Sequence, residues 1–521
     1  MTPHDLLANF EVLAEAPNGI QRLRELVLEL AVRGKLVERK RTEWATCRLD
    51  EVGDWAIGAG FPTALQGRSD EEFCFCKVSD MNLPGNNKFI VQTNHTVSAQ
   101  DLQKLRAKAH PLGTVIFPKI GGAIATNKRR VLTRPTAIDN NCLGVIPRLG
   151  VLSEWLFLVL QSIDLSKYQS GTSVPALAQG VIGAISVCVP SPEDQQETIR
   201  RVDELMVLLD RLEAKRQDRE TARTAARDSA LAALREAPTP DDVETAWLRI
   251  QERFHELFAT PEDVEPLRQA ILQLAVWGRL VNQDPSEESA QYLFDSIDRV
   301  RKQRAAAGEI KKGKIYPPVS TTEIPYQLPK EWILARLDQV FDVRDGTHDT
   351  PKYVPEGIPL VTSKNLSSGR LQIDGSKQIS LEDHLEISKR SKVDIGDILF
   401  AMIGTIGNPV IVDTCHEFSI KNMALFKPIA SRLNNMEYLL AFLRAASGSM
   451  NEVAGGGVQK FVSLGFLREH PFPLPPQEEQ MRILRNLNRL LYICDQLESA
   501  LQIGSSLRMA FSAAAVHHLE S

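Results

Sequence analysis

The chain repeats itself, and this internal duplication limits its possible folds more than any other feature of the sequence. The segment Leu23–Val37 (LRELVLELAVRGKLV) recurs as Leu267–Val281 (LRQAILQLAVWGRLV). Four further pairs of segments match in the same order: Trp44–Val52 with Trp332–Val340, Pro111–Gly121 with Asp394–Gly404, Asn141–Pro147 with Asn422–Pro428, and Pro190–Ile199 with Leu474–Ile483. Because all five pairs keep one order, we interpret the chain as two copies of one structural unit.

Each copy predicts a helical segment, a globular domain and a long helix. In the opening segment Leu23, Leu26 and Leu30 form an apolar stripe with a 3.6-residue period, and Gly34 and Gly278 stand where helices often end on a left-handed residue. The globular parts carry short β-rich runs such as TVIF and DILFAMI, separated by Gly, Pro and Asn. The expected division is 1–42 (N-terminal helical segment), 43–190 (first globular domain), 191–324 (central helical spacer and linker), 325–474 (second globular domain) and 475–521 (C-terminal helix).

The two long helices have the pattern of a coiled coil. From Glu193 to about Arg235 the sequence has no Gly or Pro, and its apolar residues are spaced for a coiled-coil seam. At 1.5 Å per residue this helix would be roughly 64 Å long. The second helix is expected from Gln477 to about Leu519. Pairing would cover both apolar stripes, so the predicted fold class is mixed α/β (α+β): two similar α/β domains separated by a long antiparallel helical coiled-coil spacer, with an internal pseudo-two-fold repeat.

The composition is that of a cytoplasmic globular protein. The chain is 43% hydrophobic and 24% charged, which is ordinary for a protein with a well-buried core. No apolar run approaches the roughly 18 residues that a membrane helix needs, and the start MTPHDLLANFEVL lacks the pattern of a secretion signal. Of seven cysteines only Cys74 and Cys76 are close together, without a second Cys or His pair. This spacing favours reduced thiols over a zinc site.

Charge points to local basic patches. The net charge of −5 argues against a protein that coats nucleic acid indiscriminately, but a site-specific binder can meet phosphates with local clusters. One basic cluster is Lys128–Arg130. The other runs from Arg299 to Lys314, within an insertion that precedes the second globular domain. For each cluster a solvated surface without a ligand is an equally good interpretation.

Several segments resemble the specificity subunits of type I restriction-modification systems. They are LPPQEEQMRIL (Leu474–Leu484), DGTHDTPKYVPEGIPLVTSKNL (Asp345–Leu366), GDILFAMIGTIG (Gly396–Gly407), and EIKKGKIYPPV followed by EIPYQLPKEW (Glu309–Trp332). The resemblance covers nearly the whole chain and keeps the family's order of parts. The first copy departs from the family pattern more than the second: it has PKIGGAIATNKRR and SPEDQQ at the corresponding places.

The resemblance implies a DNA-binding protein without catalysis of its own. In this family two target-recognition domains read an asymmetric bipartite site on double-stranded DNA, held apart by the helical spacer. It implies methyltransferase (modification) subunits as partners, two of them because the chain is duplicated, together with restriction (motor and nuclease) subunits. S-adenosylmethionine, ATP and Mg are then expected on those partners, and no cofactor or metal on this chain. The segments Leu23–Val37 and Leu267–Val281 are candidate docking sites, with intramolecular packing as the alternative.

Candidate DNA contacts are polar and basic residues on expected loops, because these residue types read base edges and bind phosphates. In the first domain they are Lys119, Asn127, Lys128, Arg129, Arg130, Ser170, Thr172 and Ser173. In the second domain they are Thr347, His348, Thr350, Lys352, Tyr353, Ser363, Lys364, Asn365, Gln459 and Lys460. The last two follow a run of three glycines that could also be a flexible turn, and His348 is more consistent with a polar loop residue than with a metal or acid–base site.

Two other classes of function fit the sequence less well. A stand-alone adenine or cytosine methyltransferase would need an Asn/Asp-Pro-Pro-aromatic motif, but neither Pro317-Pro318 nor Pro475-Pro476 has such neighbours. The Asp and Glu residues concentrate on helices, not in a cluster that would hold magnesium for a nuclease. A coiled-coil scaffold that makes no DNA contact remains as the alternative to a DNA reader.

Overall fold

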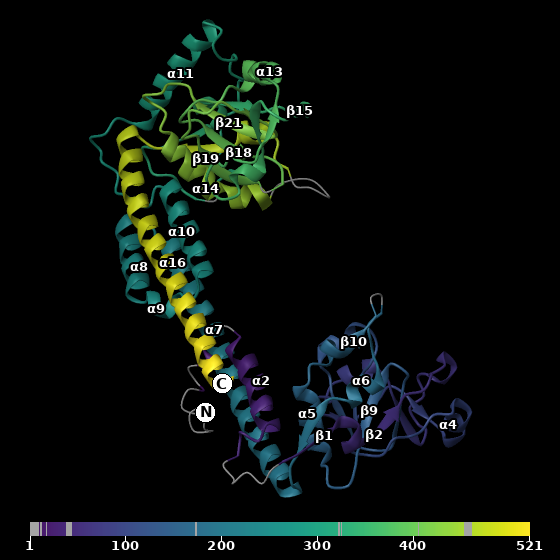
Figure 1. Ribbon diagram of the computed structural model, residues 1–521. Helices are drawn as coiled ribbons and strands as arrows, with labels where there is room; N and C mark the ends of the chain where they lie inside the picture. The colour runs from purple at the N-terminus through teal and green to yellow at the C-terminus, as the bar shows by residue number, and fades with distance from the viewer. Residues whose placement is uncertain are drawn as a thin grey trace. The chain divides into compact units, whose positions relative to one another are not determined.

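The computed structural model describes residues 10, 13–16, 18–37, 44–171, 174–320, 323–324, 326–404, 406–452 and 461–520 (Figure 1). The chain divides into two compact units. Unit 1 comprises Met1–Arg219 with Ser506–Ser521, and unit 2 comprises Glu220–Ser505. Each unit contains one of the two sheet-bearing domains. The division between the units falls within both long helices, α7 (Pro192–Glu236) and α16 (Gln477–Glu520).

The main sheet of unit 1 has five strands in the order β2-β9-β6-β7-β4. Their bounds are β2 (Gly53–Ile57), β9 (Cys142–Pro147), β6 (Val115–Pro118), β7 (Arg130–Leu132) and β4 (Phe89–Ile90). A second sheet has the order β5-β3-β8, with β5 (Thr96–Val97), β3 (Phe73–Cys76) and β8 (Thr136–Ile138). Two antiparallel pairs complete the unit: β1 (Ala45–Arg48) with β12 (Ser186–Val189), and β10 (Gln169–Ser170) with β11 (Ala176–Leu177).

Unit 2 repeats this arrangement of strands. Its main sheet has the order β14-β21-β18-β19, with β14 (Phe341–Asp345), β21 (Met423–Pro428), β18 (Ile398–Ala401) and β19 (Gly407–Ile411). The second sheet has the order β15-β17-β16-β20, with β15 (Tyr353–Val354), β17 (Lys377–Ile379), β16 (Ile358–Val361) and β20 (Ser419–Ile420). The pair β13 (Ile333–Arg336) with β22 (Pro471–Leu474) corresponds to the pair of β1 with β12.

The two sheets agree in register as well as in order. In unit 1 Val115 of β6 lies opposite Val145 of β9, and in unit 2 Ile398 of β18 lies opposite Phe426 of β21. Each second sheet contains one parallel pair, formed by β3 with β8 in unit 1 and by β16 with β20 in unit 2. The duplication read from the sequence is therefore a duplication of fold, and the predicted mixed α/β class is confirmed.

The structure corrects one of the sequence matches by a single residue. The buried amide of Gln195 donates to the carbonyl of Pro190, and that of Gln480 donates to the carbonyl of Pro475, each at 3.0 Å. Pro190 therefore corresponds to Pro475, whereas the match of Pro190–Ile199 with Leu474–Ile483 paired it with Leu474. The prolines and carboxylates around this junction allow both alignments, and only the hydrogen bonds distinguish them.

Within each unit a repeat helix lies antiparallel to one of the long helices. Helix α2 (Gly19–Val32) contacts α7 through Arg24, which bonds to Asp210 and Glu213 at 2.7 and 2.8 Å. Helix α10 (Glu265–Val276) contacts α16 through Arg268, which bonds to Asp495 and Glu498, both at 2.5 Å. The two arginines occupy the same position in the repeated segment. Leu23, Leu26 and Leu30 are buried, and Gly34 and Gly278 have φ angles of 66° and 72°, as the sequence predicted.

The long helices run in opposite directions within unit 2. Arg227 pairs with Asp263 and Arg279 donates to the carbonyl of Arg235, so α7 and the segment that contains α10 run in the same direction. Asn486 donates to the carbonyl of Leu280 while Arg268 contacts Asp495, so α16 runs in the opposite direction. Figure 1 shows α16 beside α8 (Pro240–Glu252) and α10. One hydrophobic core joins the end of α7, α10, α16 and the sheet domain of unit 2.

The remaining elements are short or lie around the sheets. In unit 1 they include α3 (Leu49–Val52), α4 (Ala99–Leu105), α5 (Ser153–Ser162) and α6 (Gln179–Gly183). In unit 2 they include α8 (Pro240–Glu252), α9 (Phe254–Leu257), α11 (Ala290–Ala306), α12 (Leu337–Val340), α13 (Leu381–Ser391), α14 (Met436–Glu452) and α15 (Leu464–Glu469). Helices α5 and α14 pack on equivalent faces of the two main sheets, where Trp155 and Tyr438 are each 1% exposed. Among the described helices, none combines the length and the apolarity that crossing a membrane requires.

Candidate nucleic-acid interface

The loop of residues 346–352, between β14 and β15, carries several of the expected contacts in unit 2. Its base is fixed by backbone bonds, because the N–H of Thr347 donates to the carbonyl of Ile420 and the N–H of Asn422 donates to the carbonyl of Thr347, each at 3.0 Å. Thr347 itself is only 8% exposed. Thr350 bonds to the ammonium group of Lys421. The loop therefore projects from a rigid edge of the sheet, and its polar side chains are positioned by neighbouring strands.

His348 is exposed, and oxygen atoms lie beside both of its ring nitrogens. Its Nδ1 lies 3.1 Å from Oδ1 of Asn422, and its Nε2 lies 2.7 Å from Oδ2 of Asp345. The hydrogen bond with Asn422, and then the bond and charge of Asp345, raise the pKa of His348. This arrangement favours an imidazolium that donates to two acceptors. Among the described residues no group of three or more His, Cys, Asp or Glu side chains could hold a metal ion.

Beyond His348 the loop offers exposed groups suited to nucleic acid. Lys352 is exposed, and Tyr353 is 41% exposed with the ammonium group of Lys377 lying 4.3 Å from its ring centroid. An exposed aromatic ring with an adjacent cation can contact both a base and a phosphate. Lys377 and Lys421 were not among the expected contacts, because they come from distant segments. Lys421 did carry a signal, since it immediately precedes the repeated segment Asn422–Pro428.

The turn Ser363–Leu366 carries expected contacts that differ in how available their side chains are to a ligand. Lys364 is exposed, and Ser363 is half-buried. The amide of Asn365 is used within the fold: its Oδ1 accepts from the N–H of Thr362, and its Nδ2 donates to the carbonyl of Gln372, each at 2.8 Å. Asn365 therefore shapes the turn that presents Lys364.

In unit 1 the basic cluster Lys128–Arg130 is mainly structural, and this changes which of its three candidate DNA contacts we retain. Arg129 is 1% exposed, and its guanidinium donates to the carbonyls of Leu160 and Ile163 at 3.1 and 3.3 Å, so we leave it out of the proposed contacts. Burial lowers its pKa to about 10. Asn127 accepts from Arg129 at 2.7 Å and donates to the carbonyl of Gln161 at 3.0 Å. Both side chains connect β7 to α5.

The other expected contacts of unit 1 differ in how accessible they are. Arg130 is half-buried, and its guanidinium bonds to backbone carbonyls, including that of Met81 at 2.8 Å. Lys128 is partly exposed and bonds to Asn82 at 2.5 Å, while Lys119 is half-buried beside β11. Ser170 is exposed on β10. Four expected contacts lie outside the described residues: Thr172, Ser173, Gln459 and Lys460.

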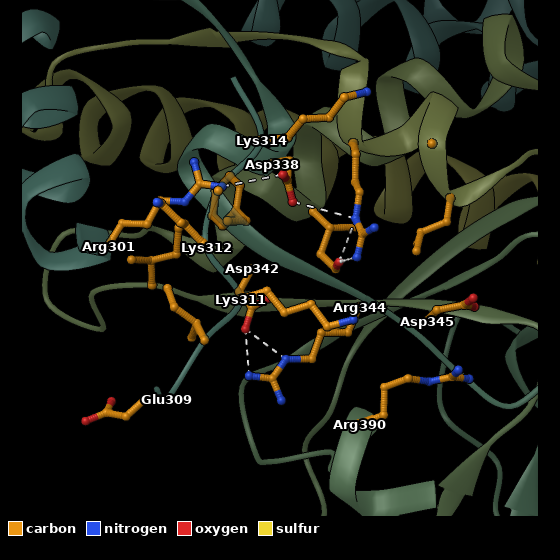
Figure 2. Close-up of a pocket in the computed structure, with 18 of the residues that line it drawn as sticks. Arg301, Glu309, Lys311, Lys312, Lys314, Asp338, Asp342, Arg344, Asp345 and Arg390 are labelled. Atoms are coloured by element: carbon orange, nitrogen blue, oxygen red, sulfur yellow. Dashed lines mark hydrogen bonds and ion pairs between the residues drawn. The ribbon is translucent and has the colours of Figure 1, made fainter. Parts of the chain in front are cut away.

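Unit 2 also contains a large cleft beside the loop of residues 346–352. Its volume is about 980 Å³, and its wall includes β14, the start of the loop, α13, α15 and the segment that follows α11. Figure 2 shows basic side chains from that segment, among them Lys311, Lys312 and Lys314, together with Arg344 of β14 and Arg390 of α13. Part of the basic cluster Arg299–Lys314 thus lines a cleft and is not simply a linker.

Comparisons with known proteins agree with this architecture. Residues 329–503 match the family described as the type I restriction modification DNA specificity domain. The chain is 29% identical over 324 residues to the Escherichia coli type I restriction enzyme EcoAI specificity subunit, covering 59% of this chain and 54% of that protein. It is 28% identical over 325 residues to the EcoEI specificity subunit, also from Escherichia coli, covering 60% and 54%. The chain thus spans about half the length of the curated relatives it matches.

A solved structure shares the fold along almost the whole chain. This structure, from work on complex assembly and conformational transition of the type I R-M system, has a TM-score of 0.52 at 16% identity and covers 93% of this chain and 99% of the other. The family match at residues 329–503 places a type I DNA specificity domain in the second half of the chain. The chain itself is a relative of the specificity subunits of type I restriction-modification systems, which is the family that its sequence motifs indicated.

Proposed function

We propose that this chain is the DNA-sequence-recognition subunit of a type I restriction-modification complex, with one target-recognition domain for each half of a bipartite site. The observation that carries the proposal is the repeat of one sheet topology, in the same register, in two domains whose surface residues differ. Two related readers with different side chains would recognise two different half-sites. The target would then be asymmetric.

The exposed loop residues supply the chemistry that such readers need. In the second domain we assign contacts to His348, Lys352, Tyr353 and Lys364, which are all exposed. In the first domain we assign contacts to Ser170, which is exposed, and to Lys128, which is partly exposed. The lysines can bind phosphates or acceptor-rich guanine edges, and Tyr353 can contact a base. His348 contributes positive charge near a phosphate, because both of its ring nitrogens already have partners in Asn422 and Asp345.

Catalysis belongs to partner chains in this proposal. The curated relatives are named as specificity subunits of restriction enzymes, and by analogy methyl transfer from S-adenosylmethionine and ATP- and Mg-dependent cleavage would occur on modification and restriction subunits. The equivalent helices α2 and α10, each antiparallel to a long helix, support two equivalent docking surfaces and therefore two modification subunits.

A domain exchange tests the proposal. The chain is expressed with its modification subunits in a host that lacks DNA methylation, and the methylated motif is read by methylation-sensitive sequencing. Residues 43–190 are then replaced by residues 325–474. We expect the wild-type complex to methylate a motif with two different halves, and the exchanged chain to methylate a motif that contains one of those halves twice.

The outcomes separate this proposal from its alternatives. Methylation without a bipartite motif, or a motif that the exchange leaves unchanged, would contradict the assignment of one half-site to each domain. A complex that methylates at random sites with or without this chain would indicate a scaffold that makes no DNA contact. Methylation by the chain without modification subunits would indicate an enzyme.

A further inference from the structure

A basic strap, residues 308–316, crosses the cleft of unit 2. It follows α11 and belongs to the insertion that distinguishes the second copy from the first. Two buried side chains anchor it: Ile310 and Tyr316 are each 9% exposed, and the hydroxyl of Tyr316 donates to Asp338 at 2.8 Å. The residues between these anchors include Lys311 and Lys312, which are both exposed. The strap is thus held at both ends and presents its lysines from a fixed position.

Most charges that line the cleft already form ion pairs. These pairs are Arg301 with Asp338 at 3.4 Å, Arg468 with Asp338 at 3.7 Å, Arg344 with Asp342 at 2.7 Å, Lys314 with Glu469 at 2.7 Å, Lys389 with Glu386 at 2.5 Å, and Glu309 with Arg304 at 2.9 Å. Asp345 pairs with His348 at 2.7 Å. These pairs fix the walls of the cleft and nearly cancel in charge, so an incoming ligand would meet the groups that remain.

The groups that remain are mainly cations. No described residue forms an ion pair with Lys311 or Lys312, and Arg390 is exposed and bonds only to an uncharged acceptor, the carbonyl of Gly346, at 2.8 Å. Asp349 is the one lining carboxylate without an ion pair in the described part of the chain. Lys311 and Arg390, both labelled in Figure 2, come from different parts of the lining, the strap and α13. Among the lining groups that have no ion pair in the described part of the chain, positive charge is therefore in excess, and it comes from the strap and from α13.

The position of these cations suggests what they bind. Arg390 holds the carbonyl of Gly346, at the start of the loop that carries His348 and Lys352, and both Thr347 and Asp349 of this loop line the cleft. An extended polyanion that contacts the loop would continue into the cleft. We propose that the basic strap clamps the DNA phosphate backbone next to the recognition loop of the second domain. This inference rests on the proposed function, because it assumes that the loop faces DNA.

A phosphate clamp predicts a specific dependence on salt. Each phosphate contact releases condensed counterions, so the slope of log K against log salt changes by about 0.9 for each contact on duplex DNA. Contacts to phosphates fix register and do not read sequence. Removing Lys311 and Lys312 should therefore weaken target and non-target binding by the same factor and should reduce the steepness of the salt slope by about 1.8.

The test uses the full chain with its modification subunits and the variant Lys311→Ala/Lys312→Ala. Fluorescence anisotropy measures affinity over a salt series for a duplex that carries the methylated motif and for a scrambled duplex of equal length and composition. The matched control is Arg299→Ala/Lys302→Ala, which removes two exposed charges of the same cluster outside the cleft. We expect the control to retain the wild-type slope within about 0.5, less than one phosphate contact.

The outcomes test the phosphate clamp and the proposed function separately. A salt slope that is unchanged in the strap variant, or a loss of affinity confined to the target duplex, would overturn the clamp. Weakened assembly with the modification subunits at an unchanged salt slope would show that the strap binds protein instead, which also overturns it. A wild-type complex that prefers no motif would contradict the proposed function, whereas the strap variant would still report on phosphate binding through the scrambled duplex.

Discussion

The two sheet domains share a framework and differ in what fills the space between sheet and helix. In unit 1 the guanidinium of Arg129 lies between β7 and α5 and bonds to the carbonyl end of that helix. In unit 2 the equivalent strand β19 approaches α14 directly at Gly407, whose φ is 105° and where a Cβ atom would lie 2.8 Å from Oγ of Ser447. One copy thus connects strand and helix with a buried cation, and the other does so by close backbone approach.

This difference shows which features a duplication preserves. Strand order, register and the ion pairs of Arg24 and Arg268 with the long helices recur in both copies. Two charged features do not recur: Arg129 has no counterpart in unit 2, and the strap that carries Lys311 has none in unit 1. A framework of apolar contacts tolerates such changes wherever each buried polar group finds a partner.

The largest expected effect comes from removing the buried cation of unit 1. Arg129→Ala leaves the carbonyls of Leu160 and Ile163 without their donor and opens a cavity beside Phe117. We expect it to destabilise the first domain by about 3 kcal/mol and to leave the second domain unaffected. Hydrogen exchange in increasing urea measures both domains separately. Lys128→Ala, at the adjacent and more exposed position, should cost less than about 0.5 kcal/mol. Equal costs for both variants would show that Arg129 does not support the fold.

The leucine stripe of α2 and the buried Arg129 show where prediction from sequence succeeds and where it fails. The apolar stripe of Leu23, Leu26 and Leu30 predicted a helix with a buried face, because burial of leucine depends on a period that one sequence displays. The run Lys128–Arg130 made its three residues candidate DNA contacts because basic groups bind phosphates, and nothing in the run indicated that Arg129 is buried. Whether a guanidinium meets backbone carbonyls depends on the packing of α5 against β7, which local sequence does not specify. Lys421 was missed for the related reason that its partner, Thr350, lies in a distant segment.

A smaller expected effect is a dependence of stability on pH in the second domain alone. It arises at a position where the two domains have different residues. The N–H of Leu49 donates to the carbonyl of Ile185, and that of Leu337 donates to the carbonyl of His470, so Ile185 and His470 correspond. Burial, and then the charge of Arg336, lowers the pKa of His470 from 6.5 to about 4. Between these values the unfolded state binds the proton more strongly than the folded state does. The second domain should therefore lose stability as the pH falls.

This loss can be measured against a substitution taken from the other copy. From about pH 7 to pH 5 the linkage amounts to about 2 kcal/mol in the free energy of unfolding of the second domain. His470→Ile introduces the residue of the first domain and should remove this part of the pH dependence. Urea unfolding followed by hydrogen exchange at both pH values provides the measurement. If His470→Ile keeps the full wild-type pH dependence, then other groups produce it and the comparison at this position is wrong.

The smallest expected effect tests the feature that both copies share. Arg24→Ala and Arg268→Ala each remove a guanidinium that joins a repeat helix to two carboxylates of a long helix. Their side chains are 25% and 19% exposed, so we expect each variant to cost about 1 kcal/mol, slightly more for Arg268 because it is better shielded from solvent.

The matched control is Arg33→Ala, which breaks an exposed pair with Glu29 on the same helix as Arg24 and should cost less than about 0.5 kcal/mol. Double-mutant cycles with Asp210→Ala and Asp495→Ala isolate the coupling energy in each copy, and hydrogen exchange of α2 and α10 reports where the stability is lost. Similar coupling in both copies is expected if the duplicated helices have kept one energetic role. Coupling in one copy alone would mean that both copies keep the same geometry but only one of the two ion pairs still stabilises its unit.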